Sequence, residues 1–193
     1  MTSFENLLLR HCAPTLIGIK QSNLFSCPAE KNNTFFFELD KYNALLNPID
    51  IYLKVLYTCK NRYYVITYRK KPMLDTLKSH KIRFYLNNIG YPLIEDDNLE
   101  QVLNHLGSRI TGCDEFPHEV GFFLGYPVED VLAFIKNKGE NFKFCGYWKV
   151  YSNEEQAKKL FRQYKRCSEV LLNKANTGTP ILNMIRVSWC KYI

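Results

Sequence analysis

The stretch Leu53-Lys-Val-Leu-Tyr-Thr-Cys-Lys-Asn-Arg-Tyr-Tyr-Val-Ile-Thr-Tyr-Arg69 carries the clearest β signal in this chain of 193 residues. Leu53, Val55 and Tyr57 alternate with Lys54 and Leu56, and residues 63–69 are mainly β-branched and aromatic. Between these two runs, residues 58–62 are polar and typical of a turn. The sequence therefore predicts an antiparallel hairpin, and with it a β-sheet in the fold.

The segments before the hairpin are shorter and less regular. Thr2-x-x-Glu5 fits a capping box that opens a helix through about Cys12, and Pro14 is expected to end that helix. The aromatic run Phe35-Phe-Phe37 predicts a strand over residues 33–39. Residues 40–46 fit one or two helical turns before a proline.

The segments after the hairpin are mainly helical in pattern. Apolar periodicity predicts a helix that begins near Pro72 and continues to Gly90, and another over residues 99–110. Two prolines fit the first turns of further helices, and alternation predicts a strand over residues 143–151. A capping box then opens the last long helix. The first of these helices has Pro117 in its first turn, and the second begins at Pro127 and ends at Gly139. The capping box of the last long helix is Ser152-x-x-Glu155.

These elements do not alternate regularly enough for a doubly wound nucleotide-binding fold. We predict an α+β fold in which a small, mostly antiparallel sheet of about three to five strands packs with several helices. No repeat or long linker divides the chain, so we expect a single domain over residues 1–193. The hydrophobic share of 46% and the charged share of 23% are those of a folded globular protein and exclude a disordered one.

The cysteines bear on the compartment. The chain has seven cysteines, and no two form a Cys-x-x-Cys pair, so the sequence indicates neither a zinc ribbon nor a thioredoxin-type dithiol. The N-terminal segment carries Glu5 and only a three-leucine run, too short for the core of a signal peptide. No apolar segment is long enough to span a bilayer. We expect reduced thiols, a cytoplasmic location and no membrane contact.

Two segments, FPHEVGFFLGYPVEDV at residues 116–131 and CGYWKVY at residues 145–151, resemble an uncharacterised family of Gram-positive, largely clostridial (Firmicute) proteins. That family is known only as a domain of unknown function. Residues 11–16, HCAPTL, also fit its pattern, and the resemblance would cover essentially the whole chain. It implies a cytoplasmic protein of an anaerobe. It supplies no activity, cofactor or catalytic residue that could be carried over.

Two pairs of residues are candidates for catalysis. A histidine beside a cysteine can support a thiolate nucleophile or a metal, which makes His11-Cys12 the first candidate. His118-Glu119, at a predicted helix start, could serve in acid–base chemistry. The alternative for both pairs is structural: His11 caps a helix end, Cys12 packs in the core, and Glu119 stabilises the helix dipole.

A metal site would require Cys12, Cys113, His118 and Cys145 to converge, which spacing alone does not indicate. Packing of these cysteines as small apolar residues is favoured, so the sequence assigns no metal and no cofactor. Whether the protein is an enzyme stays open at this point.

The segment from Phe116 to Tyr126, together with aromatic side chains of the second segment, is the candidate surface for ligand binding; its proposed binding residues are Tyr126, Tyr147, Trp148 and Tyr151. Aromatic concavities with a few polar groups are typical of ligand sites. We therefore predict a binding or regulatory module for a small molecule or a protein. The alternative is a thiol- or metal-dependent enzyme or redox protein that uses Cys12, His11 and His118.

Nucleic acid is a third and disfavoured partner. The net charge of +7 favours weak attraction to polyanions without specifying one. Cations cluster on the last long helix, at Lys158, Lys159, Arg162, Lys165 and Arg166, and after the hairpin at Arg69-Lys70-Lys71. A solvated helix face and a charged strand end are the favoured explanations of the two clusters. The sequence does not indicate the oligomeric state.

Overall fold

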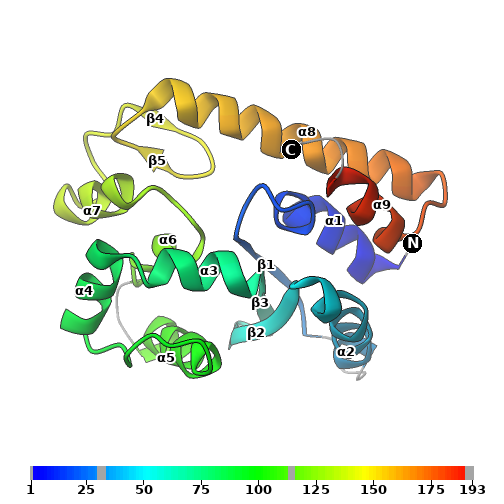
Figure 1. The fold of residues 1–193 in the computed structure, drawn as a ribbon, viewed down its shortest axis with the longest axis horizontal. Helices are drawn as coiled ribbons and strands as arrows, with labels where there is room; N and C mark the ends of the chain where they lie inside the picture. The colour runs from blue at the N-terminus through cyan, green and yellow to red at the C-terminus, as the bar shows by residue number, and fades with distance from the viewer. Residues whose placement is uncertain (1, 30–33, 113–115, 190–193) are drawn as a thin grey trace. The chain divides into compact units, whose positions relative to one another are not determined.

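The computed structural model describes residues 2–29, 34–112 and 116–189 (Figure 1). The chain divides into two compact units. The first comprises residues 1–71 and 164–193, and the second comprises residues 72–163. The second unit is thus inserted in the chain of the first. The predicted α+β class is confirmed, because helices accompany two small antiparallel sheets.

The sheet of the first unit contains the predicted hairpin. Its strands are β1 (Ser22–Pro28), β2 (Tyr52–Cys59) and β3 (Arg62–Tyr68), all antiparallel in the order β1-β3-β2. The turn between β2 and β3 consists of Lys60 and Asn61, whose φ angles are 47° and 57°. Two positive φ values suit the twist of a two-residue hairpin. Strand β1 had no counterpart among the predicted elements.

The first helix, α1 (Ser3–Leu16), begins as predicted, with the Glu5 N–H donating to the Thr2 hydroxyl oxygen at 3.1 Å. The prediction that Pro14 ends it is wrong. The helix continues past Pro14 and ends where Gly18 adopts φ +85° and the Ile19 N–H donates to the Pro14 carbonyl at 3.0 Å. Glycine takes this left-handed conformation readily, which makes it the stop signal here.

The predicted strand over residues 33–39 is also wrong, since residues 34–46 form helix α2 (Thr34–Leu46); residue 33 lies outside the described part. Its buried residues, Phe35, Leu39, Tyr42 and Leu46, recur at helical spacing. A short 3₁₀ helix, η1 (Asn47–Ile49), follows it. The Asn43 side chain accepts from the Leu53 N–H at 2.8 Å and donates to the Leu53 carbonyl at 2.9 Å, which ties α2 to β2.

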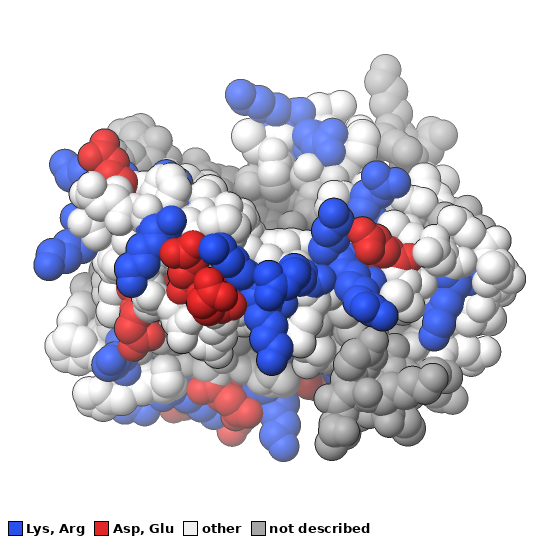
Figure 2. Space-filling model, turned by 90° about the horizontal axis from the view of Figure 1, so that it is seen from above, with Lys and Arg blue, Asp and Glu red and all other residues white. Residues whose placement is uncertain are grey.

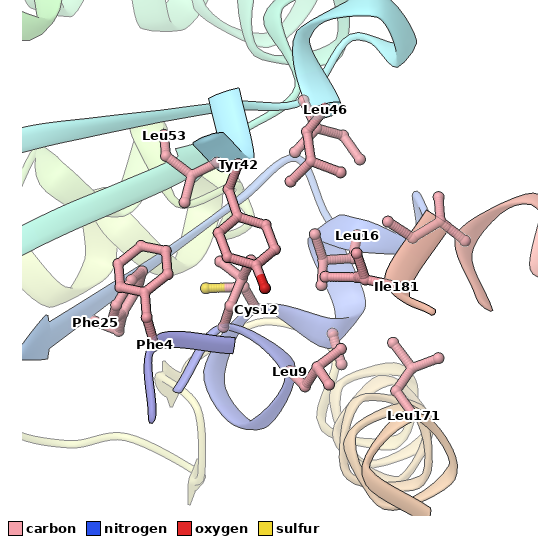
Figure 3. Close-up of a cluster of buried hydrophobic side chains, with 14 of the residues drawn as sticks. Phe4, Leu9, Cys12, Leu16, Phe25, Tyr42, Leu46, Leu53, Leu171 and Ile181 are labelled. Atoms are coloured by element: carbon pink, nitrogen blue, oxygen red, sulfur yellow. The ribbon is translucent and has the colours of Figure 1, made fainter. Parts of the chain in front are cut away.

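The core of the first unit lies between these helices and the sheet (Figure 3). Phe4, Leu9, Cys12 and Leu16 enter it from α1, Phe25 enters from β1, and Tyr42 enters from α2. Leu171 of α8 (Glu154–Asn176) and Ile181 of α9 (Ile181–Trp189) complete it. Close packing of this kind makes truncation of a buried leucine cost about 2–5 kcal/mol.

The second unit consists mainly of helices. They are α3 (Lys70–Leu77), α4 (His80–Asn88), α5 (Leu99–Gly112), α6 (Val120–Phe123), α7 (Val128–Lys136) and the start of α8. The predicted continuous helix from Pro72 to Gly90 is interrupted at Lys78–Ser79, between α3 and α4. Helix α8 is capped by the Asn153 side chain, which accepts from the Gln156 N–H at 3.0 Å, rather than by the predicted Ser152.

The single strand predicted over residues 143–151 is instead a small hairpin. Its strands are β4 (Phe144–Cys145) and β5 (Lys149–Val150), and the chain reverses between them with the Gly146 N–H donating to the Trp148 carbonyl at 3.1 Å. This hairpin forms one wall of the cavity described below. In the described ranges, no helix is both long enough and apolar enough to cross a membrane.

Candidate functional site

The second unit contains a cavity of about 280 Å³ between the β4-β5 hairpin, α7 and the segment around α6. Its walls are mainly aromatic and aliphatic, with a few polar side chains. The aromatic lining residues are Phe116, Tyr126, Phe134 and Trp148, and the polar ones are His118, Asp130, Cys145 and Lys149. Val120, Gly121, Val131 and Gly146 complete the walls. This volume lies just below the range of about 300–1,000 Å³ that is usual for sites of drug-sized ligands.

Asp130 holds the hairpin against α7. Its carboxylate is buried and accepts three N–H bonds: from Trp148 Nε1 at 2.7 Å, from the Tyr151 N–H at 2.9 Å and from the Ser152 N–H at 2.7 Å. A buried carboxylate is stable only with such donors, and each charge-assisted bond is stronger than a neutral one. Sequence spacing does not reveal this role, because the three donors lie 18 to 22 residues from Asp130 in the chain.

The Trp148 ring is fixed by aromatic contacts as well. It stacks on Tyr126 with 5.0 Å between the ring centroids and meets Phe161 edge-on at 4.5 Å. Only 8% of Trp148 is exposed, so the ring is both a packing element and a cavity wall. Burial also raises the pKa of Tyr126 to about 12, so its hydroxyl stays protonated at neutral pH.

Two glycines allow the cavity walls to approach this closely. A Cβ at Gly146 would lie 2.3 Å from Phe161 Cε2, and a Cβ at Gly121 would lie 2.7 Å from Val131 Cγ2. Both distances are shorter than any ordinary contact between carbon atoms. The glycines of the motif-bearing segments are therefore required by packing at these two positions.

Lys149 and His118 lie beside the aromatic wall of the cavity. Lys149 Nζ donates to the Gly139 carbonyl at 2.8 Å and lies over the Phe142 and Phe134 rings, 4.9 and 5.6 Å from their centroids. The His118 ring meets Phe134 edge-on at 4.9 Å. Cys145 is exposed and pairs with Lys149 across the hairpin, so both side chains leave the same face.

Glu119 lies elsewhere, in a buried ion pair. Its carboxylate accepts from Arg109 Nε at 2.5 Å and from the Tyr91 hydroxyl at 3.2 Å, and only 3% of the residue is exposed. Burial and the adjacent Glu119 charge raise the pKa of Tyr91. Among the predicted catalytic residues, His118 therefore lines the cavity, whereas Glu119 joins α5 to the start of α6.

His11 and Cys12 belong to the first unit and point to different environments. Cys12 is fully buried, and burial raises its thiol pKa to about 12, so the thiol stays protonated at neutral pH. His11 is exposed, and its ring stacks on Phe25 with 6.4 Å between centroids. Burial and the nearby Arg10 lower its pKa. The packing alternative for Cys12 thus agrees with its surroundings.

The hypothetical metal ligands are distributed over both units. His118 and Cys145 line the same cavity, Cys12 lies in the core of the first unit, and Cys113 is outside the described residues. Within residues 2–29, 34–112 and 116–189, no three His, Cys, Asp or Glu side chains gather as a metal site would require.

The predicted aromatic ligand-binding residues separate into two pairs. Tyr126 and Trp148 line the cavity. Tyr147 and Tyr151 are not among the described residues that line it. Tyr147 is 45% exposed and packs on Phe161 at 5.3 Å, and Tyr151 contributes its backbone N–H to Asp130.

The basic clusters are partly engaged in local contacts. Lys158 lies 2.6 Å from Glu154 on the first turns of α8. Arg69 is buried and donates to the carbonyls of Thr15 at 2.8 Å and Leu16 at 2.7 Å, so it caps the C-terminus of α1 and does not face solvent. On the face shown in Figure 2, acidic side chains lie among the basic ones.

Comparison with known proteins gives a family but no function. Neither the curated proteins nor the solved structures contain a match to this chain. A family model, described as "Protein of unknown function (DUF3793)", matches residues 8–185, which include the predicted motif segments and parts of both units. The chain belongs to this family of proteins of unknown function.

Proposed function

We propose that this protein is a binding or regulatory module that holds a small molecule in the cavity of its second unit. The observation that carries the proposal is the cavity itself: about 280 Å³, four aromatic walls, and a small set of polar side chains at fixed positions. Apolar walls supply binding free energy by burying ligand surface, and the polar groups orient the ligand.

The rigidity of the walls also supports binding. Asp130 and the contacts around Trp148 hold the hairpin against α7. A pre-organised site loses less conformational entropy on binding, so more of the contact free energy becomes affinity.

Catalysis is the less supported alternative. A thiol enzyme needs a cysteine with thiolate character, and Cys12 is buried with a pKa of about 12. Glu119 is already engaged by Arg109 and Tyr91. Of the predicted catalytic residues, His118 is the one that lines the cavity. A histidine at this position fits a binding site as well as it fits a catalytic site.

A titration with small planar compounds tests the proposal. Trp148 forms a cavity wall, so binding is expected to change its fluorescence in a saturable way. The variant Trp189→Phe leaves Trp148 as the single tryptophan and removes the ambiguity of the signal.

Two matched variants establish where the compounds bind. Cys145→Tyr introduces a large side chain at the cavity, and Cys59→Tyr makes the same change at an exposed position of the β2-β3 hairpin. Binding should be lost in the first variant and retained in the second. Equal affinity in both variants would reject the cavity as the site.

A further inference from the structure

The cavity's charge and aromatic geometry identify the class of ligand. We infer that the cavity receives a planar, mainly apolar ligand with one anionic group, such as an aromatic carboxylate, and that the Lys149 ammonium binds this group. The inference rests on the proposed function, because it presumes that the cavity is a binding site.

The Lys149 ammonium has a defined position beside the cavity lining. It donates one bond to the Gly139 carbonyl at 2.8 Å and lies over two aromatic rings. An ammonium has three N–H donors. This environment fixes the ammonium at the wall and lets it donate to an anion.

Asp130 also lines the cavity. A free carboxylate there would favour a cationic ligand. Oδ2 of Asp130 accepts from Trp148, and Oδ1 accepts from two backbone N–H groups. Three donors stabilise its charge and take up most of its acceptor positions, so Asp130 has less capacity than Lys149 to bind an ionic group of a ligand directly.

Charge disfavours a cationic ligand at the Phe134 side of the cavity. Aromatic rings attract cations to their faces. Among the rings that line the cavity, Phe134 is the one over which Lys149 lies. The Lys149 ammonium already occupies that position, 5.6 Å from the ring centroid. A cationic ligand at the same wall would meet a like charge.

The remaining lining sets the shape of the ligand. Phe116, Tyr126 and Trp148 present aromatic surfaces, and aromatic rings pair best with other flat surfaces in stacked or edge-on arrangements. The volume of about 280 Å³ accommodates a two-ring compound and excludes a dinucleotide.

Three isosteric probes test the inference: 2-naphthoate, 2-naphthamide and 2-naphthylmethylammonium, each titrated into the full chain at the same ionic strength. We expect 2-naphthoate to bind about tenfold more tightly than 2-naphthamide, as one charge-assisted bond predicts, and 2-naphthylmethylammonium to bind most weakly. A preference for the neutral or cationic probe would overturn the inference and leave the proposed function standing. If none of the three binds, the proposed function itself is rejected.

Variants then test Lys149. Lys149→Met should remove the preference for 2-naphthoate over 2-naphthamide, and Lys149→Arg should retain most of it. The control, Lys136→Met, removes an exposed charge from α7 outside the cavity lining and should leave the preference unchanged. A preference that survives in Lys149→Met, or that disappears equally in Lys136→Met, would contradict a role for Lys149. If Lys149→Met does not fold, Lys149→Arg and the three probes on the unmodified chain still decide the question.

Discussion

At the scale of the residue, Asp130 is the side chain on which the cavity depends most. Its carboxylate joins α7 to the indole of Trp148 and to the backbone that leads into α8. An aspartate in the first turn of a helix is normally explained by the helix dipole. Here its carboxylate also binds N–H groups of the hairpin wall that lie about twenty residues away in the chain.

Replacement of Asp130 by asparagine should therefore destabilise the fold. The amide keeps one acceptor oxygen but places a donor opposite another N–H donor, so the free energy of unfolding should fall by about 1–3 kcal/mol. Chemical denaturation measures this change. The control is Glu129→Gln, which alters an exposed neighbour paired with Lys81, where about 0–1 kcal/mol is expected. Equal stability of the two variants would show that Asp130 is not an anchor.

A second residue-scale prediction concerns Lys20, a buried lysine of the first unit. Burial lowers its pKa from 10.5 to about 7. Between these values the unfolded chain binds more protons than the folded one, so this contribution to the free energy of unfolding rises as the pH rises above 7. Below pH 7, Lys20 is charged in both states and the contribution stays at its minimum.

The pH range for this measurement is set by Cys12. Its pKa is raised from 9.0 to about 12, so above pH 9 its contribution to stability falls as the pH rises. Between pH 7 and 9, Lys20→Met should remove a rise of up to about 1.4 kcal/mol per pH unit, and the exposed Lys41→Met should not. Denaturation curves across this range decide between the two outcomes. Identical pH profiles in all three proteins would contradict a neutral, buried Lys20.

At the scale of the element, local turn chemistry made the β2-β3 hairpin predictable from the sequence. Asn61 and the polar residues around it favour a reversal, and the strands on both sides carry their own β pattern. The same reasoning failed where long-range packing decides. Three consecutive phenylalanines suggested a strand at 35–37, but the spacing of buried residues along 34–46 is helical.

The site was predictable to a similar extent. The aromatic density of residues 116–131 and 145–151 indicated Tyr126 and Trp148, and a predicted helix start indicated His118. All three line one cavity. Phe134 and Lys149 were missed because sequence spacing does not show which side chains of α7 and β5 face the same space. Tyr147 and Tyr151 stay a prediction as ligand-binding residues.

The β4-β5 hairpin gives the element-scale prediction. Gly146→Ala would place a methyl group 2.3 Å from the Phe161 ring, so the hairpin must shift, and the free energy of unfolding should fall by about 1–3 kcal/mol. Gly112→Ala, where a Cβ meets nothing within 4 Å, is the matched control. Thermal denaturation compares the two variants.

A smaller side chain at position 161 should relieve the clash. In a Phe161→Val background, Gly146→Ala should therefore destabilise the protein less than it does alone. A penalty that does not depend on residue 161 would mean that the contact with Phe161 is not the reason for the glycine.

At the scale of the whole molecule, the charge bears on the partner. The net charge is +7, yet Arg69 is buried, Lys158 is paired with Glu154, and acidic side chains lie among the basic ones on the face shown in Figure 2. Nucleic-acid binding gains most from many unpaired cations on one surface. The single-domain organisation stays a prediction, since the chain divides into two compact units.

We therefore expect no measurable binding to single- or double-stranded DNA or RNA at about 0.15 M salt. Fluorescence anisotropy with labelled oligonucleotides checks this expectation, and the triple substitution of Lys158, Arg162 and Lys165 by glutamine is the control for any signal at low salt. Tight binding at physiological salt that this triple substitution abolishes would favour the nucleic-acid alternative.

The central claim is that the cavity of the second unit binds a planar anion beside Lys149. The most direct measurement is a set of intermolecular nuclear Overhauser effects between 2-naphthoate and the protein. The account predicts contacts from the naphthalene protons to the rings of Phe116, Phe134 and Trp148, with the carboxylate end nearest the Lys149 side chain. Saturable binding with contacts to other residues only, or with the carboxylate directed away from Lys149, would contradict it.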